Sequence, residues 1–212
     1  MKRLVLGIIF VCLSQIIPLL FVPDLIIRYN NLVVVLANIL MWLTQPPVSP
    51  NETKANRSRD KYSVLLILII SLLCVASSII EWAYINKGDS SFSVFSVIGL
   101  LLLFGGILFR AVAIKTLGAH FTATVQIKED HQLITKGPYS IVRHPSYLGA
   151  WLSITGCTIF LHSVVGTFLS IFGMFYAYYI RIRVEETALV DTFGEKYKAY
   201  QKTKARLIPY IW

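Results

Sequence analysis

Charged side chains are scarce in this sequence of 212 residues, where Asp, Glu, Lys and Arg together make up 15% of the positions. Soluble domains carry about 25% charged residues, so the composition excludes an ordinary water-soluble fold. Among the charged residues the acidic ones are fewer, with 11 Asp and Glu against 20 Lys and Arg. In a soluble protein the net charge of +9 would point to nucleic acid, but here the basic residues gather in particular loops, as on the cytoplasmic side of membrane proteins. We therefore expect membrane lipids, and no nucleic acid, as partners.

Cysteine is also scarce. The three cysteines, Cys12, Cys74 and Cys157, each lie within an apolar stretch and have no near partner in the sequence. A disulfide framework or a thiolate metal site needs paired or closely spaced cysteines, so neither is predicted. His120 and His162 are far apart, and no metal-ligand spacing accompanies them. The sequence therefore predicts no metal, and we interpret the cysteines as small buried hydrophobic residues.

Long runs without Asp, Glu, Lys or Arg are what the chain has in abundance: residues 4–23, 29–51, 62–80, 90–109 and 145–180. About 20 apolar residues cross a bilayer as a helix. The first run lacks the small-x-small cleavage pattern of a signal peptide, so we interpret it as a retained helix. The last run would form a helix about 54 Å long, whereas the hydrocarbon core is about 30 Å thick. We predict that it folds into a helical hairpin with its tip around residues 161–165.

These runs predict an all-α fold, a polytopic membrane helix bundle of about five to six transmembrane segments that includes the C-terminal helical hairpin. The shortest candidate covers residues 31–43 and ends before Pro46 and Pro47. No internal repeat is evident, so we predict a single domain over residues 1–212. The loops rich in Lys and Arg place both termini in the cytoplasm. The oligomeric state is not indicated.

Most polar residues fall in two segments, 115–146 and 181–212, which lie on the same predicted side. Arg143 and His144 precede Pro145, and proline suits the first position of a helix, where an N–H would have no partner. The free N–H groups and the dipole of a helix start attract anions. This helix start, with Arg143 and His144 beside it, is a candidate anion site, although His144 would equally serve as a simple helix cap.

Arg181 and Glu185 follow the hairpin and are four residues apart, so they share one face of a helix that leaves the bilayer. Ionisable groups at such a junction are functional candidates. The alternative is structural: Arg181 and Arg183 would anchor the chain to anionic lipid, and Glu185 would pair with Arg181.

The order of the motifs favours a function. GPYSIVRHPSYLG at residues 137–149 is followed by the hairpin, by RIRVEETALVDTFGEKYKAY at residues 181–200, and by Ile208 and Pro209. This order resembles the isoprenylcysteine carboxyl methyltransferase family, with a match from about residue 121 to 212. The resemblance implies S-adenosyl-L-methionine as cofactor, in a cytoplasmic pocket formed by the loop before the hairpin and the C-terminal tail. It divides the chain into N-terminal transmembrane helices (residues 1–116) and a cofactor-binding catalytic region (residues 117–212).

The resemblance also implies roles for individual residues. Arg181 matches the arginine assigned to the substrate carboxylate, and Arg181 and Glu185 together are the expected catalytic residues. The expected cofactor-binding residues are Gln126, His131, Gln132, Leu133, Ile134, Tyr139, His144, Pro145, Ser146, Tyr147 and Glu185.

The leading hypothesis is methyl transfer to the carboxylate of an S-isoprenylated cysteine or a similar lipidic acid, on a small molecule or a protein. A carboxylate is ionised at neutral pH and needs no general base, so its methylation should be nearly independent of pH above about 6. A phospholipid or other amphiphile N-methyltransferase is the alternative, in which Glu185 or Glu186 would have to deprotonate an amine. A non-catalytic scaffold or transporter-like bundle is a third reading. A sterol reductase is disfavoured, because nothing indicates a nicotinamide site.

Overall fold

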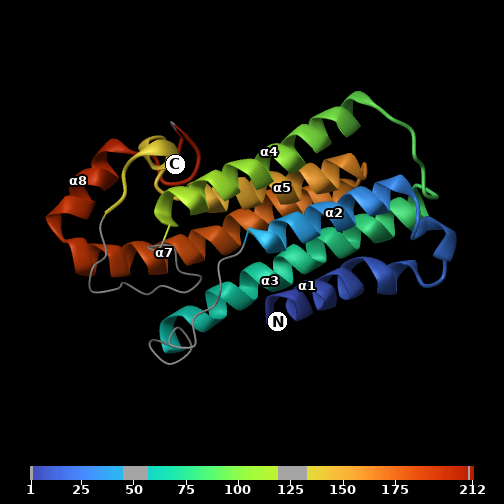
Figure 1. The fold of residues 1–212 in the computed structure, drawn as a ribbon, viewed down its shortest axis with the longest axis horizontal. Helices are drawn as coiled ribbons and strands as arrows, with labels where there is room; N and C mark the ends of the chain where they lie inside the picture. Colours follow the sequence, from blue (N-terminus) through green and yellow to red (C-terminus); the bar gives the residue numbers. More distant parts are fainter. Residues whose placement is uncertain (1, 45–56, 119–132, 210) are drawn as a thin grey trace.

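The computed structural model describes residues 2–44, 57–118, 133–209 and 211–212. Over these ranges the chain is helical and forms no strand apart from an isolated pairing of Val142 with Ala205. The long helices run roughly along the long axis of the molecule (Figure 1), which confirms the predicted all-α bundle. The helices are α1 (Lys2–Val11), α2 (Tyr29–Leu43), α3 (Arg57–Ile80), α4 (Val94–Leu117), α5 (Pro145–Phe160), α6 (Val164–Phe168), α7 (Met174–Phe193) and α8 (Glu195–Thr203).

Three helical stretches are long and apolar enough to cross a membrane: Tyr62–Ile85, Val94–Leu117 and Val164–Phe193. Two shorter apolar helices cover Val5–Leu19 and Tyr29–Leu43. The first of these is shortened by Pro18, which has no N–H to donate and lies in a 3-10 turn at the helix end. Integral membrane character follows from these lengths, while the count of five to six crossings stays a prediction.

The predicted hairpin is confirmed. α5 ends at Phe160 and α6 begins at Val164, so the turn lies at the expected tip. The backbone N–H groups of Val164 and Val165 donate to the Glu81 carboxylate at 2.9 and 3.0 Å, and Ser163 donates its hydroxyl to the same group. Glu81, near the end of the helix that contains α3, therefore caps the second helix of the hairpin and neutralises its dipole. α6 then continues through a π-helical turn into α7.

α4 and α5 touch along a stripe of glycines. A Cβ atom built on Gly99 or Gly106 of α4 would lie 2.5 Å from backbone atoms of α5, and one on Gly149 of α5 would lie 2.7 Å from the backbone N of Arg110. Such distances leave no room for a side chain. Small residues allow this approach of membrane helices, and here it brings the backbone of Arg110 against the first turns of α5.

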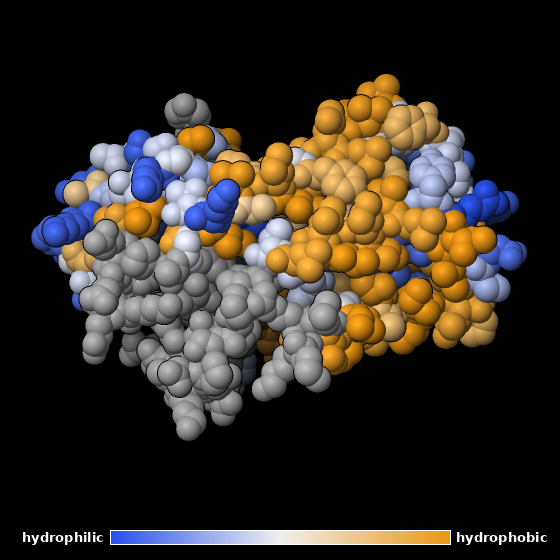
Figure 2. Space-filling view, in the orientation of Figure 1, coloured by the Kyte–Doolittle hydropathy of each residue, from blue (hydrophilic) through white to orange (hydrophobic). Residues whose placement is uncertain are grey.

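Apolar side chains cover the sides of the bundle, and polar ones gather at its ends (Figure 2). Large residues such as Leu101, Leu108 and Phe172 are 69%, 66% and 58% exposed, as expected for surfaces that face lipid rather than water. Inside, Cys74 and Cys157 are buried as predicted, Cys12 is half-buried, and all three are free thiols. No cluster of metal-ligating residues occurs in the described ranges.

Candidate functional site

The site lies where α5 begins, at the end of the bundle that also carries α8 and the C-terminal tail (Figure 1). α5 starts at Pro145, as predicted, with His144 at the capping position. The backbone N–H groups of Arg143 and His144 donate to the carbonyls of Ala205 and Arg206, at 2.9 and 3.1 Å. The C-terminal tail is thereby held alongside the start of α5, which joins the two polar segments identified in the sequence.

Glu186 is the charged centre of this junction. Its carboxylate accepts hydrogen bonds from Arg143 Nε at 2.7 Å and from His144 Nε2 at 3.2 Å, and it pairs with Arg206 Nε at 3.0 Å. Gln201 of α8 donates to it as well, at 3.3 Å. Arg143, His144 and Glu186 are all nearly fully buried. Arg143 Nε and His144 Nε2 thus point to Glu186, an anion within the chain itself.

A second chain of polar contacts runs beside the first. Tyr147 donates its hydroxyl hydrogen to Glu185 Oε2 at 2.7 Å and accepts a hydrogen bond from Arg181 Nε at 3.1 Å. Arg181 also donates from Nη1 to Ser63 Oγ of α3, at 3.2 Å. The structure thus brings together three of the predicted residues, Tyr147, Arg181 and Glu185. Arg181 and Glu185 do lie on one face of α7, but the Tyr147 hydroxyl bridges them.

Arg110 of α4 was missed by the sequence reasoning and belongs to the same site. It is 7% exposed, and its Nη1 donates to the carbonyl oxygen of Ser146 at 2.9 Å. The charge-free run ends at Phe109, and no role was predicted for Arg110, which lies within α4, a helix that continues to Leu117. Its spacing was the available signal: Arg110 is four residues after Gly106 and so lies on the face of α4 that meets α5.

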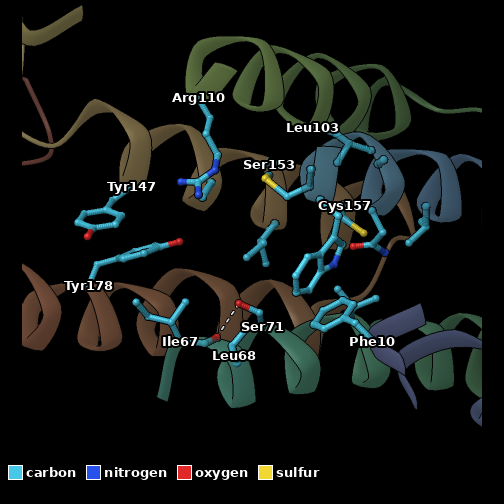
Figure 3. Close-up of a pocket in the computed structure, with 18 of the residues that line it drawn as sticks. Phe10, Ile67, Leu68, Ser71, Leu103, Arg110, Tyr147, Ser153, Cys157 and Tyr178 are labelled. Atoms are coloured by element: carbon cyan, nitrogen blue, oxygen red, sulfur yellow. Dashed lines mark hydrogen bonds between the residues drawn. The ribbon is translucent and has the colours of Figure 1, made fainter. Parts of the chain in front are cut away.

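Arg110, Tyr147, Tyr178 and Arg181 border one end of a cavity of about 300 Å³. Toward the other end the walls are apolar and include Leu103, Cys157 and Phe10 (Figure 3). The volume is at the lower end of the range for small-molecule sites, which are mostly apolar with a few convergent polar groups. In Figure 3 the Arg110 side chain points from α4 into the space above the rings of Tyr147 and Tyr178. The cavity therefore suits a ligand with an apolar chain and an anionic head.

The remaining predicted residues are placed in part. Gln126, His131 and Gln132 lie outside the described residues. Leu133 and Ile134 are half-buried in the segment that leads to Tyr139, with no described contact to the residues above. Tyr139 is buried, and its carbonyl accepts the hydroxyl of Tyr200. Pro145 and Ser146 form the buried first turn of α5.

Three tyrosines around this junction stay protonated over the physiological range. Burial raises the pKa of Tyr200 to about 12. Burial, together with the negative charge of Glu185, raises the pKa of Tyr139 well above its usual value. The pKa of Tyr197 is raised in the same direction by burial and by the nearby charge of Glu186. These hydroxyls are therefore neutral hydrogen-bond donors.

Known proteins share both sequence and helical architecture with this chain. The model of the isoprenylcysteine carboxyl methyltransferase family matches residues 97–191. Protein-S-isoprenylcysteine O-methyltransferases from Dictyostelium discoideum and Saccharomyces cerevisiae are 36% and 31% identical to the chain, over 81% and 76% of its length. The chain spans 71% and 66% of the lengths of these two proteins, and 41% of the Xenopus laevis one, which is 36% identical.

A solved structure of a eukaryotic intramembrane Ras methyltransferase superposes with a TM-score of 0.66 at 27% sequence identity. The match covers 99% of this chain and 75% of the other. A relative of 36% identity over most of the chain and a shared helical architecture show the family. The chain belongs to the isoprenylcysteine carboxyl methyltransferase family of integral membrane methyltransferases.

Proposed function

We propose that the protein transfers a methyl group from S-adenosyl-L-methionine to the carboxylate of an S-isoprenylated cysteine or of a similar lipidic acid. The observation that carries this proposal is the placement of two buried guanidinium groups, those of Arg110 and Arg181, at one end of an apolar cavity. The relatives named protein-S-isoprenylcysteine O-methyltransferase support the same reaction.

An acceptor that joins a carboxylate to a long apolar chain fits the cavity at both ends. Each CH₂ group buried among the apolar walls contributes about 0.8 kcal/mol to binding. The carboxylate would accept forked hydrogen bonds from Arg110 and Arg181 and offset their positive charges. The ammonium of an amine acceptor would be repelled by the same two charges. The guanidinium pair therefore favours a carboxylate over an amine acceptor.

The donor side of the site also fits its expected cofactor. S-Adenosyl-L-methionine needs a carboxylate for its ammonium or ribose hydroxyls, donors for its own carboxylate and an apolar surface for adenine. The Glu185 side chain remains 29% exposed, so it can meet the first need. The protonated Tyr139 hydroxyl is a donor, and Leu133 and Ile134 offer half-buried apolar surface. The proposed cofactor site consists of these four residues with Gln126, His131, Gln132, His144, Pro145, Ser146 and Tyr147.

The chemistry asks for positioning rather than for acid–base catalysis. The cofactor, when bound, supplies a methyl group on a positively charged sulfur. The carboxylate acceptor is already ionised, so no side chain has to remove a proton. Arg110 and Arg181 would hold a carboxylate oxygen in line with that methyl group, at about 3–3.5 Å, and such alignment can lower a barrier by about 7–11 kcal/mol. The buried surroundings of both guanidinium groups keep water away from the reacting atoms.

Methyl transfer to two acceptors in parallel tests the proposal. The protein, purified in lipid nanodiscs, would receive radiolabelled S-adenosyl-L-methionine with either a farnesylated cysteine analogue or phosphatidylethanolamine. Base-labile label on the cysteine analogue is the expected result, because a methyl ester hydrolyses in base. Stable label on phosphatidylethanolamine alone would overturn carboxyl methylation in favour of N-methylation, and label on neither would overturn both.

The basic loops support an orientation with both termini and the site on the cytoplasmic side. A division into N-terminal helices (1–116) and a catalytic region (117–212) remains our proposal, with the qualification that Ser63 and Arg110 of the first part contribute to the site. Labelling of an introduced C-terminal cysteine by an impermeant reagent in intact cells would contradict the orientation.

A further inference from the structure

We infer that Tyr147 is a positioning residue that couples the two halves of the site, so that binding of the methyl donor at Glu185 orients Arg181 for the acceptor. This inference rests on the proposed function and goes beyond it, because it assigns to one hydroxyl group the task of linking two ligands. The observation behind it is the continuous path from Arg181 through the Tyr147 hydroxyl to Glu185.

The direction of the hydrogen bonds along this path is fixed. A guanidinium group can only donate and a carboxylate can only accept. The Tyr147 oxygen therefore accepts from Arg181 Nε at 3.1 Å while its hydrogen goes to Glu185 Oε2 at 2.7 Å. Each of these bonds polarises the hydroxyl in the sense that strengthens the other. A change in the hydrogen bond between Tyr147 and Glu185 therefore alters the strength of the hydrogen bond between Arg181 and Tyr147.

The Tyr147 ring is held in place without help from a ligand. It stacks on the ring of His144, with centroids 5.7 Å apart and planes at 12°, and on the ring of Tyr178, with centroids 5.1 Å apart and planes at 22°. His144 is in turn fixed by its bond to Glu186. These contacts hold the Tyr147 ring so that its hydroxyl lies between Arg181 and Glu185.

The Glu185 end of this path is open to a ligand. Glu185 uses only Oε2 toward Tyr147, and over the described part of the chain no hydrogen bond to its Oε1 occurs. Its side chain is 29% exposed, against 6% for the neighbouring Glu186. A cationic or hydroxyl group of the donor that binds Oε1 would fix the carboxylate, and with it the hydrogen bond from Tyr147.

The two arginines proposed to bind the acceptor carboxylate have different hydrogen-bond partners. Arg110 donates to a backbone carbonyl, that of Ser146. Arg181 is positioned by two hydroxyls, those of Ser63 and Tyr147. A donor that fixes Glu185 would therefore order Arg181 through the Tyr147 hydroxyl. Because coupling between two sites is reciprocal, an acceptor carboxylate on Arg181 should also tighten donor binding.

Tyr147→Phe tests this coupling, since it keeps the ring stacking and removes only the hydroxyl. In nanodiscs, the Kd of S-adenosylhomocysteine would be measured with and without a saturating farnesylcysteine analogue. In the wild type the analogue should tighten binding at least about fivefold, within the usual range of coupling. In Tyr147→Phe this effect of the analogue should vanish, and kcat/KM should fall about 10- to 100-fold, as for a lost bond to a charged group.

Tyr179→Phe is the matched control. It removes a hydrogen bond of the same kind, from Arg183 at 3.2 Å, on the outer face of α7, and should leave the coupling and the activity unchanged. As a second measurement, Arg181→Lys removes the Nε donor. The double variant with Tyr147→Phe and Arg181→Lys should reduce turnover by less than the product of the two single effects. Both substitutions remove the same hydrogen bond between Arg181 and Tyr147, so their effects should not be independent.

Three outcomes would contradict the inference. Coupling of wild-type size in Tyr147→Phe would overturn it, as would a wild type that methylates the analogue but binds the two ligands independently. A Tyr147→Phe protein that no longer binds S-adenosylhomocysteine would show a simple donor contact instead. A wild type that neither binds nor methylates the analogue would overturn the proposed function itself, and is recognised by the absence of product.

Discussion

Two adjacent glutamates on α7 have different tasks because one residue turns a helix by about 100°. Glu186 faces the start of α5 and the tail, is 6% exposed in its side chain, and contacts Arg143, His144 and Arg206. Glu185 is 29% exposed and accepts one hydrogen bond, from Tyr147. Glu186 therefore holds the scaffold together, and Glu185 remains open to a ligand.

This division predicts opposite effects for the two residues. Glu186→Ala should lower the free energy of unfolding by about 3–5 kcal/mol, because it leaves buried cations without their counter-charge. Glu185→Gln should leave the unfolding temperature nearly unchanged and weaken S-adenosyl-L-methionine binding about tenfold or more, the loss expected for a hydrogen bond to a charged group. Thermal unfolding in nanodiscs and equilibrium binding distinguish the two, and a fully stable Glu186→Ala protein would contradict the assignment.

The two cavity arginines make a separate prediction. Arg181→Ala or Arg110→Ala should reduce turnover on a carboxylate acceptor about 10²–10³-fold, as when one donor to a developing or reacting oxygen is removed. Binding of S-adenosylhomocysteine alone should change little, since neither residue is proposed to contact the cofactor. Radiolabel transfer and binding assays on the same preparations provide both values. Turnover like that of the wild type would remove the residue concerned from the mechanism.

Local motifs predicted some residues of this site but not the hydrogen bonds and ion pairs between them. Pro145 fixed a helix start, and the spacing of Arg181 and Glu185 placed both on one face, as the structure confirms. Which carboxylate pairs with Arg143 and His144 depends on how α7 is rotated against α5, and a single sequence does not encode that rotation locally. The same limit hid Arg110, whose role follows only from the contact between two helices.

At the scale of helices, the glycine contact between α4 and α5 should be the most sensitive packing feature. Gly106→Leu would place side-chain atoms where the backbone of Gly149 already lies, 2.5 Å from the new Cβ. Overpacking of this kind costs about 1–3 kcal/mol, occasionally more, and it would displace Arg110 along with α4. A lower unfolding temperature and a loss of methyl transfer should therefore appear together.

The neighbouring glycine is a control for this effect. A Cβ on Gly105 meets nothing within 4 Å, so Gly105→Ala should be tolerated and can add about 1 kcal/mol through helix propensity. Destabilisation by Gly105→Ala as large as that by Gly106→Leu would mean that glycine is needed at both positions for a reason other than the contact with α5.

The ends of the helices were predicted from the charged residues that border each charge-free run. This worked for some helices and failed for others. The hairpin followed from a run too long for one crossing, and its turn lies where expected. The first run was taken as one full helix, yet Pro18 and a π-helical turn at Cys12–Ile16 interrupt its regular pattern. α4 passes through Arg110 because the positive charge has a buried partner in the carbonyl of Ser146, a compensation that hydropathy alone does not register.

At the scale of the whole molecule, the apolar sides of the bundle and the polar end that carries the site face different surroundings (Figure 2). We call the apolar sides the apolar belt. The apolar belt faces the lipid of the membrane, where a prenylated acceptor would also be found. The polar end carries α8, the tail and the hydrogen-bonded junction around Glu186, where a water-soluble cofactor would arrive. The cavity has Arg110 and Arg181 at one end and extends among apolar side chains of the bundle, including Leu103 and Phe10. In the proposed function, this arrangement would bring a lipid-soluble acceptor and a water-soluble cofactor to one point.

The pH dependence of the complete reaction follows from this arrangement. A carboxylate acceptor, with a pKa of about 3.5, is fully ionised from pH 7 to pH 9, and the described tyrosines near Glu186 stay protonated because their pKa values are raised. Turnover should then change less than about twofold between pH 7 and pH 9. An amine acceptor must first lose a proton, so its methylation would rise about tenfold per pH unit below the pKa of the amine. Initial rates at saturating acceptor separate the two cases, and a steep rise with the farnesylcysteine analogue would show that a proton has to be removed before methyl transfer.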